Sequence, residues 1–539
     1  LALVVGLFNI LPSLLIWHNL ADSGGNFLLM QQNTYRDEFF QYMPRAREIY
    51  DGHFPPTGIY ANESGSSPLN PITSLLFSVF LFIFNGNINW AYLSAQFFFS
   101  SIIFLLFYFL GWILFRSRKY SLFFALVGIF TQIPQLLFRY YDRDYLGITL
   151  KKFIPIVRTP ISKMYFARMD DPMITFPILL AALIALYIFW IRPRISSAVL
   201  AGFFSGLLAY TYLHYWLFVM VFIFALFLCI LCFYRKDKNR IKQYIFLCLA
   251  VFLVLIPYFL NYLYFNSSEY SGDYSIRLGK ETERFLIWNY INTPIGWTFV
   301  ANHFVYLFLL AIVYFFYFRG GRRSEKGIFF LGLILAMFFV WQTPLFLGFG
   351  FALSHFNKPI NLAVFIILFG IGLEFFKYIK LRNRMAGKLI VFFSVLLVLS
   401  LLVKHAVNAS LFLKPQPDQL QAYNFPEGLT SSWDWINHSG FKEPKIVSDS
   451  LITSIYLTSY TSAKPYLATG FLSILPNAEL QKRFLLSNKL FNVSSEVLDG
   501  RFKSRFPLDC SISECFKDSR INFDKSMWYL ASASLEFEF

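Results

Sequence analysis

The sequence predicts an α-helical membrane protein with many spans, followed by a small, more polar C-terminal segment. Of its 539 residues, 57% are hydrophobic and only 14% are charged, whereas soluble domains are about half apolar and about a quarter charged. Aromatic residues make up 21% of the chain, and Trp and Tyr are enriched at membrane–water interfaces. This composition excludes an ordinary soluble domain.

About eleven apolar segments are long enough to cross a bilayer, which takes about 20 residues. They lie near residues 1–20, 90–115, 120–138, 173–191, 195–212, 213–234, 243–265, 298–318, 327–348, 359–376 and 388–409. The first is interpreted as a retained helix, because no small-residue cleavage site follows it. The run from Ile72 to Phe84 is too short to span, and we expect a re-entrant or surface-lying helix there.

The net charge of +16 comes from short connectors between the apolar segments. Five connectors, within 116–119, 192–194, 235–242, 319–326 and 374–388, hold 19 basic and three acidic residues, and the remainder holds 28 of each. Short basic connectors are typical of cytoplasmic loops. The pattern therefore predicts that all five share the cytoplasmic face, and it argues against binding of nucleic acid.

This topology places the N-terminus inside and the long loops outside. The outer loops are 21–89, 139–172, 266–297 and 349–358, together with the tail after about residue 410. The tail has no spanning run, and its length suffices for a small α+β domain with its own core. We therefore expect a transmembrane domain over 1–409 and an extracytoplasmic domain over 410–539.

Local patterns in the tail predict a helix start at Ser432, a candidate N-cap, and a short strand over Lys445–Asp449. Cys510 and Cys515 could form a local disulfide in an oxidising compartment. The other cysteines lie in apolar runs, where they would pack as small hydrophobic side chains. They are Cys229, Cys232 and Cys248.

Asp37 and Glu38 form an adjacent carboxylate pair in the first outer loop. Pro44 suits the first turn of a short helix that Gly52 ends, so the pair would precede a helix whose dipole keeps carboxylates ionised. Flanking aromatic residues would hold this juxtamembrane helix at the bilayer surface. An ionised carboxylate can act as a base or bind a divalent metal, and helix capping is the alternative role for Asp37.

A second acidic pair, Asp170 and Asp171, lies at the mouth of an apolar segment. Acidic side chains at membrane depth are costly and tend to be functional, although helix capping would also select them. Asp142 and Asp144 lie at the other end of the same loop. Either pair could complete a carboxylate cluster with Asp37.

Basic residues of the outer loops are candidates for holding phosphate. The second loop carries seven basic and four acidic residues and the first carries three and six, which suggests a cleft between them, or two solvated loops that neutralise each other. The candidates are Arg36, Arg45, Arg158, Lys163 and Arg168, with His355 and Lys358 near the last outer turn. Lys358 could instead snorkel to the interface. His214 is interpreted as a structural residue.

These features together resemble the GT-C superfamily of integral-membrane glycosyltransferases. Asp37-Glu38 is similar to the Asp-Glu pair of protein O-mannosyltransferases. Arg168-Met-Asp-Asp171 is similar in position to the second acidic motif of oligosaccharyltransferase catalytic subunits. His355-Phe-Asn-Lys358 resembles the segment where related enzymes carry an Arg for the lipid phosphate. Ser432-Trp-Asp-Trp435 matches the Trp-Trp-Asp-type acceptor motif only loosely, which argues against sequon-directed N-glycan transfer.

The resemblance implies transfer of a sugar from a polyprenyl-phosphate donor to a glycan, lipid or protein acceptor at the extracytoplasmic face of the plasma or inner membrane. Asp37, with Glu38, would deprotonate the acceptor hydroxyl, which attacks the anomeric carbon with inversion. Arg168 and Lys358 would stabilise the departing lipid phosphate. A divalent metal (Mg²⁺ or Mn²⁺) bridged by Asp37 and the second acidic pair is left open, as are the sugar, the acceptor and the oligomeric state.

Two other functions stay open. A transporter or flippase for a lipid or anion would favour repeated halves and charged or broken helices at the midplane, whereas this sequence has no evident internal repeat and its charges lie at span ends. A membrane-anchored structural or assembly protein would need no acidic loop.

Overall fold

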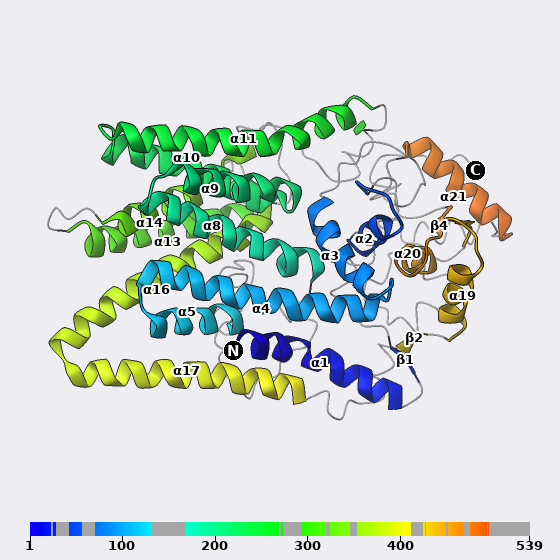
Figure 1. The fold of residues 1–539 in the computed structure, drawn as a ribbon, viewed down its shortest axis with the longest axis horizontal. Helices are drawn as coiled ribbons and strands as arrows, with labels where there is room; N and C mark the ends of the chain where they lie inside the picture. Colours follow the sequence, from blue (N-terminus) through cyan, green and yellow to red (C-terminus); the bar gives the residue numbers. More distant parts are fainter. Residues whose placement is uncertain are drawn as a thin grey trace.

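The structure is a computed structural model. It describes residues 1–22, 25–27, 42–56, 71–131, 168–268, 271–272, 294–319, 324–344, 353–410, 424–425, 427–448, 451–466, 475–492 and 494. In these ranges the chain is mainly helical, with two two-stranded sheets. Long helices form a bundle, and the short helices and strands gather at one end of it (Figure 1).

Seven helices in the described ranges are long and apolar enough to cross a membrane. They are α1 (Ala2–Asp22), α4 (Ile88–Phe115), η4 (Met169–Ile174) continuing into α8 (Thr175–Ile191), α10 (Leu213–Phe233), α11 (Lys238–Asn266), α16 (Asn357–Arg382) and α17 (Arg384–Ser410). The other apolar segments also contain helices. These are α5 (Arg118–Phe130), α9 (Ile195–Leu207) with the turn η5 (Leu208–Tyr210), α13 (Pro294–Tyr317) and α14 (Glu325–Val340). The prediction of a helical membrane protein is confirmed.

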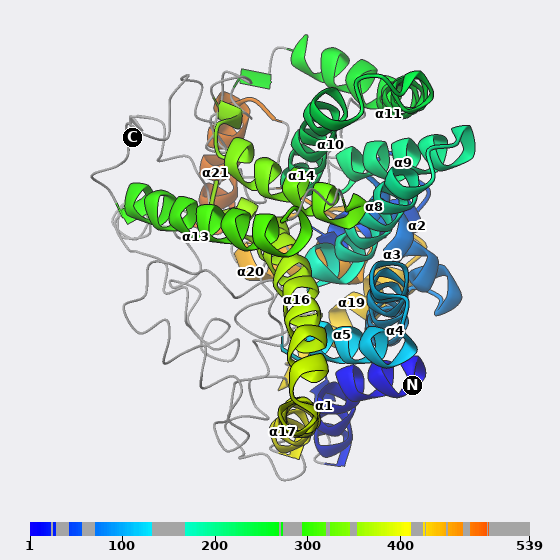
Figure 2. The same ribbon diagram turned by 90° about the vertical axis from the view of Figure 1, so that its left-hand side faces the viewer.

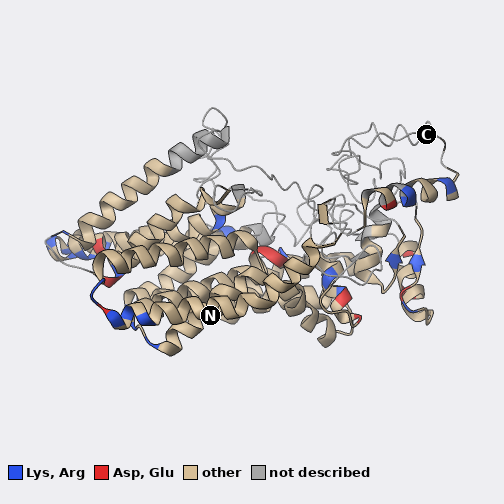
Figure 3. Cartoon of the chain, turned by 90° about the horizontal axis from the view of Figure 1, so that it is seen from above, with Lys and Arg blue, Asp and Glu red and all other residues tan. Residues whose placement is uncertain are grey.

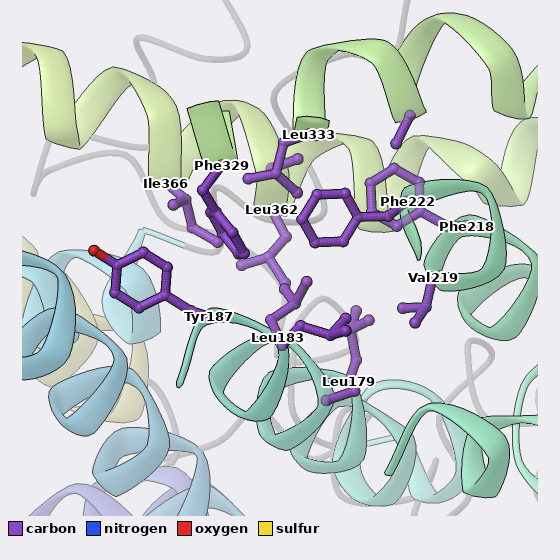
Figure 4. Close-up of a cluster of buried hydrophobic side chains, with 14 of the residues drawn as sticks. Leu179, Leu183, Tyr187, Phe218, Val219, Phe222, Phe329, Leu333, Leu362 and Ile366 are labelled. Atoms are coloured by element: carbon purple, nitrogen blue, oxygen red, sulfur yellow. The ribbon is translucent and has the colours of Figure 1, made fainter. Parts of the chain in front are cut away.

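The bundle core is formed by large apolar side chains that face each other across neighbouring helices. Figure 2 shows α16 near the centre, with α13, α14 and α5 around it. Figure 4 shows side chains of α8, α10, α14 and α16 packed together, among them Leu179, Phe222, Phe329 and Leu362, all of which are buried. Helices that bury a face against protein and leave another face apolar suit a bilayer environment.

The described residues of the five basic connectors lie at one end of this bundle. Figure 3 shows Lys and Arg gathered at that end, where α4 turns into α5, α8 into α9, α10 into α11, α13 into α14 and α16 into α17. Two connectors are joined by Arg240 and Glu325, whose guanidinium and carboxylate make two contacts of 3.1 Å. Lys326, next to Glu325, joins the same connector to that of Glu374 at 3.1 Å. The connectors therefore share one face of the bundle.

Two short helices lie at the opposite end, α2 (Met43–Tyr50) and α3 (Pro71–Ile83). Pro44 stands in the first turn of α2, as expected. Gly52 follows the end of α2 with φ +104°, a conformation that glycine adopts at little cost. The 13 residues of α3 are too few to span a bilayer. It packs beside α2 and α4 and does not run the length of the bundle.

The interfacial position expected for α2 is wrong. Met43 and Ile49 are buried, and even Arg45 and Glu48 are only 7% and 5% exposed. The reason is that α2 lies between α3 and α20 (Leu451–Tyr460), a helix of the C-terminal segment. Because protein covers α2 on two sides, its apolar side chains Met43 and Ile49 are not available to the bilayer.

The C-terminal segment contains α19 (Glu427–His438), α20, α21 (Asn477–Leu490) and two short strand pairs. Strand β3 (Lys445–Ile446) lies within the predicted strand and pairs in parallel with β4 (Lys464–Pro465). β1 (Asn26–Phe27) pairs antiparallel with β2 (Asn424–Phe425). The N-cap expected at Ser432 is wrong. α19 begins five residues earlier, and the Ser432 hydroxyl donates to the carbonyl of Gly428 at 2.6 Å.

The described apolar residues of the tail share a core with the first outer loop. One cluster joins side chains of α1, α2, α3, α4 and η4 to Trp433, Ile436, Tyr456 and Leu457. In the described ranges, the tail thus packs onto the membrane domain through its principal apolar side chains. The assignment of two separate domains stays a prediction.

Candidate functional site

Three helices begin close together at the end of the bundle that faces the C-terminal segment. They are α8 after η4, α10 after η5, and α16 after η7 (Leu353–Phe356). Contacts between their first residues show this convergence, since Lys358 of α16 reaches both Asp171 of η4 and Tyr212, the residue before α10. Helix N-termini carry partial positive charge and unpaired N–H groups, so they favour an anion.

Asp171 makes three side-chain contacts in the site. Its side chain is 3% exposed. Oδ1 accepts hydrogen bonds from the Tyr215 hydroxyl at 2.5 Å and the Thr175 hydroxyl at 3.1 Å. Oδ2 accepts from the ammonium group of Lys358. Both carboxylate oxygens are therefore occupied, and the ion pair and charge-assisted hydrogen bonds compensate for the burial of the charge.

A second chain of hydrogen bonds runs from Lys358 to His355. Lys358 donates to the Tyr212 hydroxyl at 3.4 Å, and the same hydroxyl is hydrogen-bonded to Nδ1 of His355. The Tyr212 hydroxyl therefore links the ammonium group of Lys358 to the imidazole ring of His355. Burial, with smaller contributions from His214 and Lys358, lowers the pKa of His355 to about 3. The ring is therefore neutral at physiological pH.

Asp170 faces a different set of groups. It is 5% exposed, and its electrostatic neighbours include Asp171, Arg168 and Arg45 of α2. Arg45 has no ion pair in the described part of the chain. Its guanidinium lies 5.6 Å from the ring centroid of Tyr42, and its Nε has no hydrogen-bond partner there. Arg45 is thus a buried cation with unused donor capacity.

Among the described residues of the site, the charges sum to a positive value. Three cations, Lys358, Arg168 and Arg45, stand against two carboxylates, Asp170 and Asp171, and the nearby histidine is neutral. A largely buried cluster of three cations beside three helix N-termini is suited to an anion such as a phosphate group.

The structure brings together six of the residues singled out in the sequence. They are Arg45, Arg168, Asp170, Asp171, His355 and Lys358. The remaining candidates lie outside the described residues. They are Arg36, Asp37, Glu38, Asp142, Asp144, Arg158 and Lys163. The contact expected between Asp37 and the second acidic pair therefore stays a prediction.

Sequence reasoning missed the hydroxyl groups around Asp171. Tyr212, Tyr215 and Thr175 were not candidates, and His214 was interpreted as structural although its ring centroid lies 4.9 Å from that of His355. A signal was available in the run of tyrosines just before α10. Hydroxyl-bearing aromatic residues at a span end suit a polar site as well as an interfacial belt.

The described part of the site does not fit a divalent metal. Among these residues no group of three or more His, Cys, Asp or Glu is placed to hold one. The two oxygens of Asp171 already accept from protein donors, and the surrounding cations would repel a metal ion. We derive no chemical step through a metal.

The sequence was also compared with known proteins. No family model matches it, and no curated protein matches it significantly.

Proposed function

We propose that this protein is a membrane glycosyltransferase that takes a sugar from a polyprenyl-phosphate donor. The observation that carries the proposal is the largely buried cluster at the convergence of α8, α10 and α16, at the end of the bundle opposite the basic connectors. Its described residues include three cations, Lys358, Arg168 and Arg45. A lipid phosphate presented at the membrane surface could enter such a site while its chain stays in the bilayer. The resemblance to the GT-C superfamily supports the same interpretation.

The cluster would stabilise the leaving group. When the bond between the anomeric carbon and the phosphate oxygen breaks, negative charge grows on the phosphate, and fixed positive groups lower the barrier. Lys358 has three N–H donors, and two are directed at Asp171 and Tyr212, which leaves one for a phosphate oxygen. Arg45 and Arg168 would supply further donors.

The acceptor hydroxyl needs a base, and Asp37, assisted by Glu38, is our proposal. Its carboxylate would take the hydroxyl proton as the acceptor oxygen bonds to the anomeric carbon with inversion, and the polyprenyl phosphate would leave. Asp37 precedes Tyr42 by five residues, so chain length keeps their Cα atoms within about 18 Å. The Tyr42 ring centroid lies 5.6 Å from the guanidinium carbon of Arg45, which is an electrostatic neighbour of Asp170. Asp37 is thus close enough in the chain to reach the cluster.

The proposal includes a topology with about eleven crossings. The shared face of the five connectors supports an even number of crossings between successive connectors. Because short basic connectors favour the cytoplasm, the site and the C-terminal segment would then be extracytoplasmic, in the plasma or inner membrane. The C-terminal segment would contribute to acceptor recognition.

The test is transfer by purified protein from a panel of radiolabelled polyprenyl-phosphate sugars to candidate acceptors. Asp37→Asn should abolish transfer, and Lys358→Met should lower kcat by about 100-fold or more, because removing a donor to a developing anion costs about 3 kcal/mol. The matched control is Lys377→Met, which changes an exposed lysine of the same helix at the connector end and should behave as wild type.

Full transfer by Asp37→Asn would overturn the assignment of the base. The main rival is a transporter or flippase for a lipid or anion. Two results together would favour this rival. The wild-type protein would transfer sugar from no donor, and Asp37→Asn would move a polyprenyl phosphate across the membrane of proteoliposomes at the wild-type rate.

A further inference from the structure

Helix α2 joins the candidate site to the C-terminal segment. It packs on α3 on one side and on α20 on the other. Arg45 is an electrostatic neighbour of Asp170, and α2 shares an apolar cluster with η4 through Met43 and Ala46. Glu48, three residues after Arg45, forms an ion pair with Lys464 of β4. Residues three apart are neighbours on a helix surface, so the cation of the site and the anchor to the tail stand on adjacent positions of one helix.

The ion pair between Glu48 and Lys464 is buried. The two side chains are 7% and 6% exposed. A buried pair contributes little net stability, because desolvation offsets its attraction, but removal of one partner leaves an uncompensated charge. Such a pair is best suited to fixing how two elements fit together. Here it fixes the position of α2 relative to the tail.

The tail also holds the chain on both sides of α2. Before the helix, β1 pairs with β2 of the tail. After the helix, His53 is hydrogen-bonded to Glu443 of the tail. A helix of eight residues is too short to be stable alone in water. The position of α2, and with it that of Arg45, must therefore come from these tertiary contacts.

We propose that Glu48 and Lys464 are positioning residues that hold Arg45 against the phosphate site, so that docking of the C-terminal segment sets the affinity of the site for a lipid phosphate. The proposal rests on the function proposed above. Neither residue touches the phosphate. Arg45 is the group that does so, since it is buried, is an electrostatic neighbour of Asp170 and has no ion pair among the described residues.

The test measures binding of undecaprenyl phosphate, a probe without a sugar, to the full-length protein in detergent by calorimetry. Arg45→Met should weaken binding about 10- to 100-fold, as expected for loss of a hydrogen bond to a charged group. Lys464→Met and Glu48→Gln should each weaken it about 10-fold, which corresponds to 1.4 kcal/mol. Lys489→Met, at an exposed lysine of α21, is the control and should bind as wild type.

The charge-reversed double variant Glu48→Lys/Lys464→Glu separates positioning from a general loss of structure. It should recover most of the wild-type affinity, and hydrogen exchange in α2 should be fast in the single variants and slow again in the double variant. If the double variant folds but binds as poorly as the single variants, the positioning role is wrong, even where a single variant fails to fold.

The two proposals fail in different ways. If Lys464→Met and Glu48→Gln bind as tightly as wild type while Arg45→Met does not, the phosphate site stands and the coupling to the tail is refuted. If Arg45→Met and Lys358→Met both bind as wild type, the phosphate site is refuted, and the function proposed above loses its main support.

Discussion

Replacing Asp171 with Asn should destabilise the protein and at the same time strengthen its binding of phosphate. Asp171 is 3% exposed and pairs with Lys358, and removing one partner of a buried ion pair costs about 3–5 kcal/mol. The cost should fall near the lower bound, because the carbonyl oxygen of Asn can still accept from Tyr215. The released ammonium group would then be free for an anion.

The affinity gain follows from the charge that is removed. A carboxylate about 4 Å from a bound anion repels it by about 1 kcal/mol in water and about 4 kcal/mol at an effective dielectric constant of 20. Asp171→Asn should therefore tighten binding of undecaprenyl phosphate by about 10-fold or more. Lys358→Met removes the cation and should weaken it by a similar factor. The two variants thus change affinity in opposite directions although both destabilise the fold.

A double-mutant cycle provides the stability measurement. The unfolding free energies of Asp171→Asn, Lys358→Met and the double variant are compared in detergent, with Lys377→Met as the control. Replacing both charges should cost less than the sum of the single changes by about 2 kcal/mol or more, because neither charge is then left unpaired. Additive effects would show that the two groups are not coupled. Weaker phosphate binding by Asp171→Asn would mean that the pair is only structural.

Three further changes are testable. Burial lowers the pKa of His355 in the folded protein to about 3, whereas its ordinary value is 6.5, so between these pH values the unfolded chain binds a proton that the folded protein does not. Stability should therefore fall by about 1.4 kcal/mol per pH unit well below pH 6.5, and His355→Asn should remove this component in thermal melts. Gly202→Ala should cost about 1–3 kcal/mol, since the added Cβ would lie 2.5 Å from a side chain of α11, whereas Gly372→Ala, with open space around it, should be neutral or slightly stabilising. Tyr215→Phe should cost about 1.5–3 kcal/mol through loss of the 2.5 Å hydrogen bond to Asp171, measured by denaturant unfolding in detergent.

The features predicted correctly depend on local chemistry. Runs of about 20 apolar residues become helices wherever they occur, and the charges between them lie at the bundle ends because charge is excluded from apolar surroundings. The sequence also predicts where α2 begins and ends, because Pro44 favours the first turn of a helix and Gly52 adopts a positive φ after its last turn. Asp171 and Lys358 were found because ionised groups beside long apolar segments are rare enough to stand out.

The features that were missed depend on partners far away in the chain. The burial of α2 comes from α20, which lies about 400 residues later in the chain. No pattern in the sequence near α2 predicts that α20 packs on it. The roles of Tyr212 and Tyr215 arise only because α8, α10 and α16 begin at the same place. Ser432 shows a different cause of error, since a serine inside a helix can donate back to a carbonyl one turn earlier as readily as it can cap.

The pairing of Glu48 with Lys464 also sets the order in which the molecule can be completed. The two residues are 416 positions apart, and at about 5–20 residues per second a ribosome needs roughly 20–80 s to make the intervening chain. During that time α2 lacks its cover and Glu48 its counter-charge, while the apolar helices are already available for insertion. The site is therefore assembled last, and a chain that stops before β4 would enter the membrane without a finished site.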